Sequence, residues 1–114
     1  MIKPIAIIAG EPNGISSEII FKAWKLRKNY AHKPFFIIGN TKLLNLQKKR
    51  FKYNFKIKNI SNNFMLKELK SNELPVYNIK YKQNKPFEKI TKKSNKYILN
   101  SFSKGIDLIK KKKL

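Results

Sequence analysis

The sequence predicts an α/β protein with helices on both faces of a parallel sheet, a partial α/β/α layered fold. Strand-like and helix-like segments alternate in the order strand, helix, strand, helix, strand, strand, helix. Two strand-like segments, 4–9 and 35–39, are continuous apolar runs bounded by turn residues, which is typical of strands buried on both faces. Strands connected through helices form parallel, layered sheets. We expect one incomplete domain over residues 1–114, because a further strand would normally follow the last helix.

The first strand and helix occupy about residues 4–28. The strand ends at a turn that contains Gly, Pro and Asn, the residues that favour turns. The helix is predicted over 16–28, with Ser16 or Ser17 as its cap and Glu18 near the positive end of its dipole. Apolar residues at helical spacing predict its buried stripe, with two more beside it: Ile15, Ile19, Ala23 and Leu26, then Ile20 and Trp24.

The middle of the chain predicts a second helix and a strand near the edge of the sheet. After the strand 35–39, Asn40 or Thr41 is expected to cap a helix over about 41–51. Residues 53–60 alternate between apolar and polar side chains, which predicts a half-exposed edge strand. The next twelve residues favour no element clearly.

The last third of the chain predicts a strand, a loop and a long helix. The strand is expected over 74–79 with Pro75 near its start, and the polar stretch 80–89 is expected to be a loop. The helix is predicted over about 91–111. Its expected buried stripe consists of residues at steps of four, four and three: Ile98, Phe102, Ile106 and Ile109.

The formal net charge of +21 normally indicates a nucleic-acid or anionic-membrane partner. However, there are 25 lysines and only 2 arginines, and Lys, Asn and Ile make up 54 of the 114 residues. These three residue types share A/T-rich codons, whereas selection for phosphate or base contacts would favour arginine. We interpret the charge as codon bias on a solvated surface and do not expect nucleic-acid binding. A small basic nucleic-acid-binding module is the alternative, and it predicts strongly salt-dependent association.

Several kinds of site are excluded by composition. The chain has no cysteine, which excludes disulfides, thiolate metal sites and a cysteine nucleophile. The single histidine, His32, is expected at the surface between a helix and a strand and is not assigned as a metal ligand. Neither a bilayer-spanning apolar run nor a signal peptide is recognisable, so we expect a cytoplasmic protein without membrane association.

The loop after the first strand is the best indication of a functional site. It runs Gly-Glu-Pro-Asn-Gly-Ile-Ser-Ser-Glu over residues 10–18. Such a loop lies at the carboxyl end of a parallel sheet, where open α/β proteins bind ligands, and before a helix N-terminus, which favours anions. It lacks the Gly-Lys-Ser/Thr of a P-loop and the Gly-x-Gly-x-x-Gly of the usual dinucleotide fold. Judged on its residues alone, it is better explained as a tight turn that needs glycine.

Residues 5–19 resemble the opening of the 4-hydroxythreonine-4-phosphate dehydrogenase family of vitamin B6 biosynthesis. That family begins with a strand, the motif Gly-(Asp/Glu)-Pro-Ala-Gly-Ile-Gly-Pro-Glu and a helix. The matching residues are Gly10, Glu11, Pro12, Gly14, Ile15 and Glu18. Residues 36–44 and 94–102 resemble the next two landmarks of the family, in order. The resemblance spans nearly all of this chain and only the N-terminal portion of the family.

The resemblance implies a fold like that of isocitrate and isopropylmalate dehydrogenases. It also implies oxidation of 4-phosphooxy-threonine with NAD or NADP and a divalent metal. By this resemblance Glu11, Gly14 and Ile15 are expected near the dinucleotide. The metal-binding histidines and catalytic lysine of the family lie beyond the matched portion, so no catalytic or metal-ligating residue is assigned here. The chain alone is therefore expected to be inactive and to bind no cofactor fully.

The resemblance further implies a phosphorylated small-molecule substrate and a homodimer. A related dehydrogenase of another phosphorylated sugar acid is the alternative within the same class of enzyme.

Overall fold

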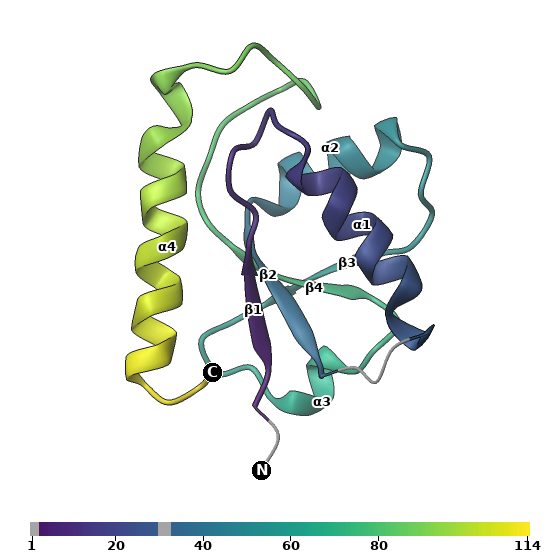
Figure 1. Cartoon of the computed structure of the whole chain (residues 1–114), viewed down its shortest axis with the longest axis vertical. Coiled ribbons are helices and arrows are strands. Elements are labelled where there is room, and N and C mark those ends of the chain that lie inside the picture. The colour runs from purple at the N-terminus through teal and green to yellow at the C-terminus, as the bar shows by residue number, and fades with distance from the viewer. Residues whose placement is uncertain (1–2, 30–32) are drawn as a thin grey trace.

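The computed structural model describes residues 3–29 and 33–114. Four strands form one parallel sheet in the order β1-β2-β4-β3 (Figure 1). Their bounds are β1 (Ile5–Ile8), β2 (Phe35–Gly39), β3 (Ile57–Ile60) and β4 (Leu74–Asn78). The predicted parallel sheet is confirmed, and so is the predicted order of elements, except that a short helix that was not predicted lies between β3 and β4. His32, which we expected at the surface, lies outside the described residues.

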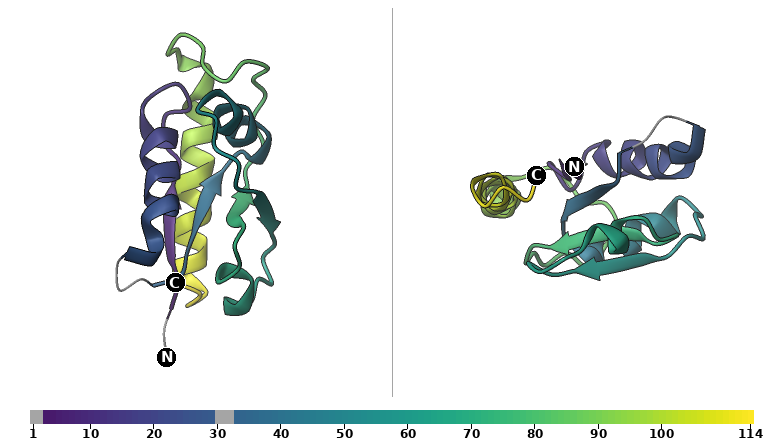
Figure 2. Two further views of the ribbon diagram at one scale, coloured as in Figure 1. Left: turned by 90° about the vertical axis from the view of Figure 1, so that its right-hand side faces the viewer. Right: turned by 90° about the horizontal axis from the view of Figure 1, so that it is seen from below.

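Helices lie on both faces of the sheet, as predicted (Figure 2). The helices are α1 (Ser16–Leu26), α2 (Thr41–Arg50), α3 (Leu66–Leu69) and α4 (Asn95–Lys110). One apolar core joins α1 and α2 to the sheet, and a second joins α3 and α4 to the opposite face. The chain moves from β1 to β2 and on to β3 with helices on the first face, then returns to β4 through α3 on the second. A constant handedness of the crossovers requires this change of face.

The first core is centred on Phe21 of α1, which is completely buried. Its ring lies 5.8 Å from that of Tyr53 and 5.6 Å from that of Phe55, measured between centroids. These aromatic residues fall in the segment 53–60 that we predicted as a strand, yet only Ile57–Ile60 is one. The reason is that β4 begins at Leu74, which pairs with Ile57, so the residues before Ile57 have no strand beside them. The predicted position of this strand at an edge is confirmed.

The predicted buried stripe of α1 is wrong. Ile15, just before the helix, is 71% exposed, and Ile19 and Leu26 are 57% and 44% exposed. The buried apolar side chains are Ile20, Phe21 and Trp24. Two large aromatic rings provide more apolar area than the Ile/Leu row, and this decides which face of α1 turns inward.

The predicted stripe of α4 is also largely wrong, because Phe102, Ile106 and Ile109 are more than half exposed. The buried residues of this helix are mostly small or polar: Tyr97, Ser101, Gly105 and Leu108. Gly105 explains this orientation, since a Cβ there would lie 3.3 Å from Cδ1 of Ile8. The lack of a side chain lets α4 lie close against β1 and β2.

The predicted cap of α1 is wrong, whereas the predicted cap of α2 is confirmed. Ile15, rather than Ser16 or Ser17, is the N-cap of α1, and it makes no side-chain cap hydrogen bond. Asn40 caps α2 as predicted, with Oδ1 accepting from the Leu43 backbone N–H at 2.9 Å.

The strand predicted over 74–79 and the helix predicted over about 91–111 correspond to β4 and α4. The segment 61–72, which favoured no element clearly, contains the short helix α3. Pro75 lies near the start of β4, and the β2–β4 pairing begins one residue later, at Val76. Pro75 is therefore tolerated in a central strand although it has no N–H to donate. Among residues 3–29 and 33–114, we find no helix with the length and apolar character of a membrane span.

Candidate functional site

Three segments that are far apart in the sequence meet at the carboxyl edge of the sheet. They are the loop after β1, the exit of β2 and the beginning of α4, which are the segments that carried the family resemblance. The hydroxyl of Ser94 donates to Oε2 of Glu11 at 3.2 Å. The backbone N–H of Asn40 donates to the hydroxyl oxygen of Tyr97 at 2.9 Å. Residues 11, 40, 94 and 97 therefore form one connected structure at the edge where α/β proteins bind ligands.

Tyr97 is held in an almost fully buried position behind this edge, with 4% of its surface exposed. Its ring stacks on that of Tyr81 with centroids 4.7 Å apart. Burial disfavours the phenolate and raises the pKa of Tyr97 to about 12, although the hydrogen bond from Asn40 acts in the opposite direction. Tyr97 is therefore a neutral structural group at physiological pH.

Gly39 is required at the end of β2 because other side chains approach it closely. A Cβ at this position would lie 2.8 Å from Cβ of Ala9 and 3.1 Å from the Tyr97 hydroxyl. The first of these distances is shorter than real Cβ contacts allow. The close packing of β1, β2 and α4 at this point therefore depends on a residue without a side chain.

The loop after β1 is fixed by polar contacts with a second loop, 80–89. The side chains of Asn13 and Gln83 bond to each other through both amides, at 2.8 and 3.2 Å. Asn13 also accepts from the backbone N–H of Glu88 at 2.8 Å. Nε2 of Gln47, on α2, donates to the carbonyl of Pro12 at 2.7 Å. The backbone of the loop is thus preorganised by neighbouring segments.

The three residues expected near a dinucleotide differ in their surroundings. Glu11 turns its carboxylate inward, where Oε1 accepts from the backbone N–H of Asn13 at 3.1 Å. Gly14 has space for a side chain, since a Cβ would lie 3.5 Å from Cγ of Glu11. The side chain of Ile15 is exposed. Their contact with a cofactor stays a prediction. Gly10 is the residue of this loop whose backbone conformation requires glycine, because its φ is 73°.

An asparagine-rich hollow of about 570 Å³ adjoins the same edge, beside the N-terminus of α2. Its lining combines four amides, a hydroxyl, two cations, a phenol and one apolar side chain: Asn40, Thr41, Lys42, Asn45, Leu46, Lys49, Asn59, Asn78 and Tyr81. Oδ1 of Asn78 accepts from the backbone N–H of Thr41 at 3.0 Å, which ties the end of β4 to the start of α2. Amide groups, lysines and a helix N-terminus suit a ligand that carries hydroxyl and anionic groups.

Our sequence reasoning missed this hollow, although a signal was present. Asn40 directly follows β2, Asn78 ends β4, and Asn59 is the penultimate residue of β3. Because the carboxyl ends of parallel strands meet at one edge, three asparagines at strand ends predict a cluster there.

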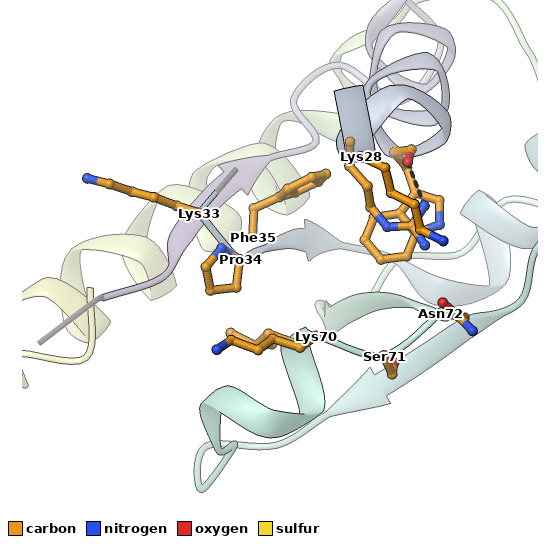
Figure 3. Close-up of a pocket in the computed structure, with 10 residues that line it drawn as sticks. Lys28, Lys33, Pro34, Phe35, Lys70, Ser71 and Asn72 are labelled. Carbon is orange, nitrogen blue, oxygen red and sulfur yellow. Dashed lines mark hydrogen bonds between the residues drawn. The ribbon is translucent and has the colours of Figure 1, made fainter. Parts of the chain in front are cut away.

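A second hollow, of about 340 Å³, lies at the opposite edge of the sheet (Figure 3). Lys28, Lys33 and Lys70 line it together with Arg27. The guanidinium of Arg27 lies 3.7 Å from the centre of the Trp24 ring and donates to the Trp24 carbonyl at 2.8 Å. This hollow does not adjoin the loop after β1, so we place the candidate site at the carboxyl edge.

The described residues do not fit a metal ion. Among residues 3–29 and 33–114, no three His, Cys, Asp or Glu side chains gather into a group that could hold one. The carboxylate of Glu11 accepts hydrogen bonds from Asn13 and Ser94, neither of which is a carboxylate.

Two comparisons with known proteins lead to the same enzyme. The chain is 50% identical over 38 residues to 4-hydroxythreonine-4-phosphate dehydrogenase from Zymomonas mobilis subsp. mobilis. The crystal structure of 4-hydroxythreonine-4-phosphate dehydrogenase from Burkholderia phymatum matches the whole chain with a TM-score of 0.85 and 16% identity. The resemblance to 4-hydroxythreonine-4-phosphate dehydrogenase is confirmed. No protein-family model matches the chain.

The chain covers only part of these dehydrogenases. The 38 aligned residues are 33% of this chain and 11% of the Zymomonas enzyme, and the structural match covers 34% of the Burkholderia chain. At 16% identity the structural match establishes the fold. The prediction of an α/β fold of the isocitrate/isopropylmalate dehydrogenase type is thereby confirmed.

Proposed function

We propose that this chain is the N-terminal part of an NAD(P)- and divalent-metal-dependent dehydrogenase that oxidises 4-phosphooxy-threonine in vitamin B6 biosynthesis. The observation that carries the proposal is the 50% identity over 38 residues to a 4-hydroxythreonine-4-phosphate dehydrogenase. The match of the whole chain to the fold of a second such enzyme supports it. On this proposal residues 1–114 form an incomplete domain that is inactive alone.

In the proposed enzyme this chain contributes one wall of the cofactor site. Glu11 fixes the shape of the loop after β1 through its bonds to Asn13 and Ser94. The backbone at Gly14 and the exposed side chain of Ile15 are then presented beside the dinucleotide. NAD(P), when bound, supplies the acceptor for the hydride from the substrate hydroxyl. The described residues bring together no group of three His, Cys, Asp or Glu side chains, so the proposed metal needs ligands from outside them.

An NMR titration of the uniformly ¹⁵N-labelled chain with NADH tests the proposal. We expect weak, saturable shifts at the backbone amides of Glu11, Gly14 and Ile15, and no shift at Lys67 on α3. A chain of net charge +21 attracts any polyanion, so inorganic pyrophosphate serves as the matched control. Shifts that pyrophosphate reproduces, or that spread over lysine-bearing surfaces, would contradict a dinucleotide site at this loop.

A further inference from the structure

The hollow at the opposite edge of the sheet, where β2 and β4 begin, has a lining divided between apolar and cationic side chains (Figure 3). It lies between the end of α1, the segment that enters β2 and the turn after α3, and we call it the basic hollow. The apolar part of its lining consists of Trp24, Pro34, Phe35 and Leu69, and the cationic part of Arg27, Lys28, Lys33 and Lys70. Ser71 and Asn72 complete it, so none of the described residues that line the hollow is acidic.

The size and lining of the basic hollow define the class of ligand that fits it. Small-molecule sites have volumes of about 300–1,000 Å³, so a hollow of about 340 Å³ suits a small organic molecule rather than a macromolecule. An inorganic ion alone would leave the apolar part of the lining uncovered. None of the four cations forms an ion pair with a described residue, and a doubly charged phosphate is attracted to them more strongly than a carboxylate. The lining therefore suits an organic phosphate with an aromatic or other apolar part.

Arg27 is the cation whose side chain is held in place. Its guanidinium carbon lies 3.7 Å from the centre of the Trp24 ring, and Nη1 donates to the Trp24 carbonyl at 2.8 Å. This bond is the single hydrogen bond of the Arg27 side chain among the described residues, so further N–H groups remain for a ligand. Arginine is rare in this chain, with 2 residues against 25 lysines, and its planar fork of donors matches phosphate better than lysine does.

Trp24 contributes a hydrogen-bond donor without an acceptor. Its side chain is almost completely buried, and its Nε1–H has no hydrogen-bond partner among the described residues. Buried indole N–H groups usually have a partner, because an unpaired buried donor costs free energy. A ligand oxygen within reach of Nε1 would supply the missing acceptor at this wall of the hollow.

The ends of the helices explain only part of this cationic cluster. Arg27 and Lys28 follow α1, where cations complement the negative end of the helix dipole. Lys70 follows a helix of only four residues, and Lys33 precedes a strand. The helix dipole also gives no reason for an apolar surface in the middle of the cations. A ligand with an anionic and an apolar part accounts for both halves of the lining.

We propose that the basic hollow is a second ligand site of this protein. It binds the phosphate of a small organic phosphate through Arg27 and the three lysines, and Phe35 with its apolar neighbours covers the rest of the ligand. The hollow does not adjoin the loop after β1, so this site is separate from the candidate site at the carboxyl edge. The inference does not depend on the proposed function.

An NMR titration of the ¹⁵N-labelled chain with phenyl phosphate, an aromatic ring that carries one phosphate, tests the proposal. Trp24 is the single tryptophan, so its indole N–H gives one distinct signal. We expect saturable one-to-one binding that shifts this signal and leaves the amide of Gly14 unchanged. Salt at about 0.15 M screens isolated surface lysines and is present throughout. Inorganic phosphate and phenol, the two halves of the probe, should each bind at least about tenfold more weakly.

A pair of double variants locates the charges. Lys33→Gln/Lys70→Gln removes two cations of the basic hollow, and the matched control Lys67→Gln/Lys82→Gln removes two exposed lysines elsewhere. The first should weaken the binding of phenyl phosphate at least about tenfold, and the control by less than about twofold.

A pair of single variants tests the arginine. Arg27→Lys keeps the positive charge and loses the planar donors, so it should weaken the binding of phenyl phosphate about fivefold. The same change at the other arginine, Arg50→Lys, should leave the affinity unchanged. All four variants should keep the circular dichroism spectrum of the wild type, since each of the substituted side chains is at least partly exposed.

The proposal is overturned if phenyl phosphate causes no saturable shift of the Trp24 indole signal, or if test and control variants weaken binding equally. Inorganic phosphate that binds as tightly as phenyl phosphate would show an adventitious ion only. Benzoate that binds more tightly would show that the ligand is a carboxylate, which also overturns the proposal. None of these results bears on the dehydrogenase, which the NADH titration tests at the loop after β1.

Discussion

Replacing Tyr97 with phenylalanine removes one hydroxyl from the buried junction of β2 and α4. The backbone N–H of Asn40 donates to that hydroxyl at 2.9 Å and loses this partner in the variant. An unsatisfied buried donor costs about 1–3 kcal/mol. We expect Tyr97→Phe to lower the free energy of unfolding by that amount at pH 7.

The same substitution has a distinct signature at alkaline pH. Burial raises the pKa of Tyr97 to about 12 from an ordinary value of 10.0. Below pH 10 the hydroxyl is protonated in both states. Between pH 10 and 12 the unfolded chain loses this proton and the folded chain keeps it, so the wild type loses stability as pH rises. The loss is about 1.4 kcal/mol at pH 11 and approaches about 2.7 kcal/mol above pH 12. The Tyr97→Phe variant has no hydroxyl to titrate at this position and therefore lacks this loss of stability.

Urea unfolding at pH 7, 9 and 11 measures both effects, with the fluorescence of Trp24, the single tryptophan, as the signal. The lysines titrate in both proteins, so their contribution cancels in the difference between the two. That difference should narrow by about 1.4 kcal/mol from pH 9 to pH 11. Tyr53→Phe, which removes a hydroxyl from a partly buried ring, is the matched control and should change stability by less than about 0.5 kcal/mol at pH 7. A difference that stays constant from pH 9 to 11 would show that the Tyr97 hydroxyl is not shielded as described.

Four further substitutions test the packing and the loop by the same unfolding assay. Gly39→Ala places a Cβ 2.8 Å from that of Ala9 and should cost about 1–3 kcal/mol, while Gly14→Ala, which meets ordinary contact distances, should cost less than about 1 kcal/mol; equal costs would contradict the close approach. Phe21→Ala empties the centre of the first core and should cost about 3–5 kcal/mol; a loss below 1 kcal/mol would show that the surrounding aromatic rings close the cavity. Glu11→Gln weakens the bonds to the loop and to α4 and should cost about 1 kcal/mol; an unchanged stability would indicate that the loop holds its shape without this carboxylate.

The order of elements was predictable because it depends on local patterns. The apolar runs at 5–8 and 35–39 are bounded by turn residues, so their strands were found within one or two residues. The strand predicted over 53–60 is longer than the observed β3. An alternation of apolar and polar residues indicates only which face of a sheet each side chain would take. It does not record whether a neighbouring strand is present to pair with it.

The inward faces of α1 and α4 were not predictable from hydrophobic periodicity. Periodicity identifies an apolar row, and the row was assumed to be buried. On α1 a competing face with Phe21 and Trp24 turns inward, and on α4 a face with Ser101 and Gly105 does so. The second choice depends on how closely the helix can approach Ile8, which is a property of the assembled structure.

The candidate site was predictable in its place but not in its contacts. The turn residues at 10–14 located the carboxyl edge, and Tyr97 appeared in the sequence only as part of a helix motif. Its bond to the backbone of Asn40 joins residues 57 positions apart, which no local pattern reveals. Glu11 was expected near a ligand, but its carboxylate accepts hydrogen bonds from Asn13 and Ser94 and so fixes the shape of the loop.

The orientation of α4 results from a competition between two faces of the helix. Turning the helix to bury Phe102 and Ile106 would gain about 1.5–3 kcal/mol for each side chain. That rotation would also withdraw Tyr97 from Asn40 and Gly105 from Ile8. In the isolated chain the two faces compete for the sheet. The contacts of Tyr97 and Gly105 decide this competition, which is why Phe102 and Ile106 face outward.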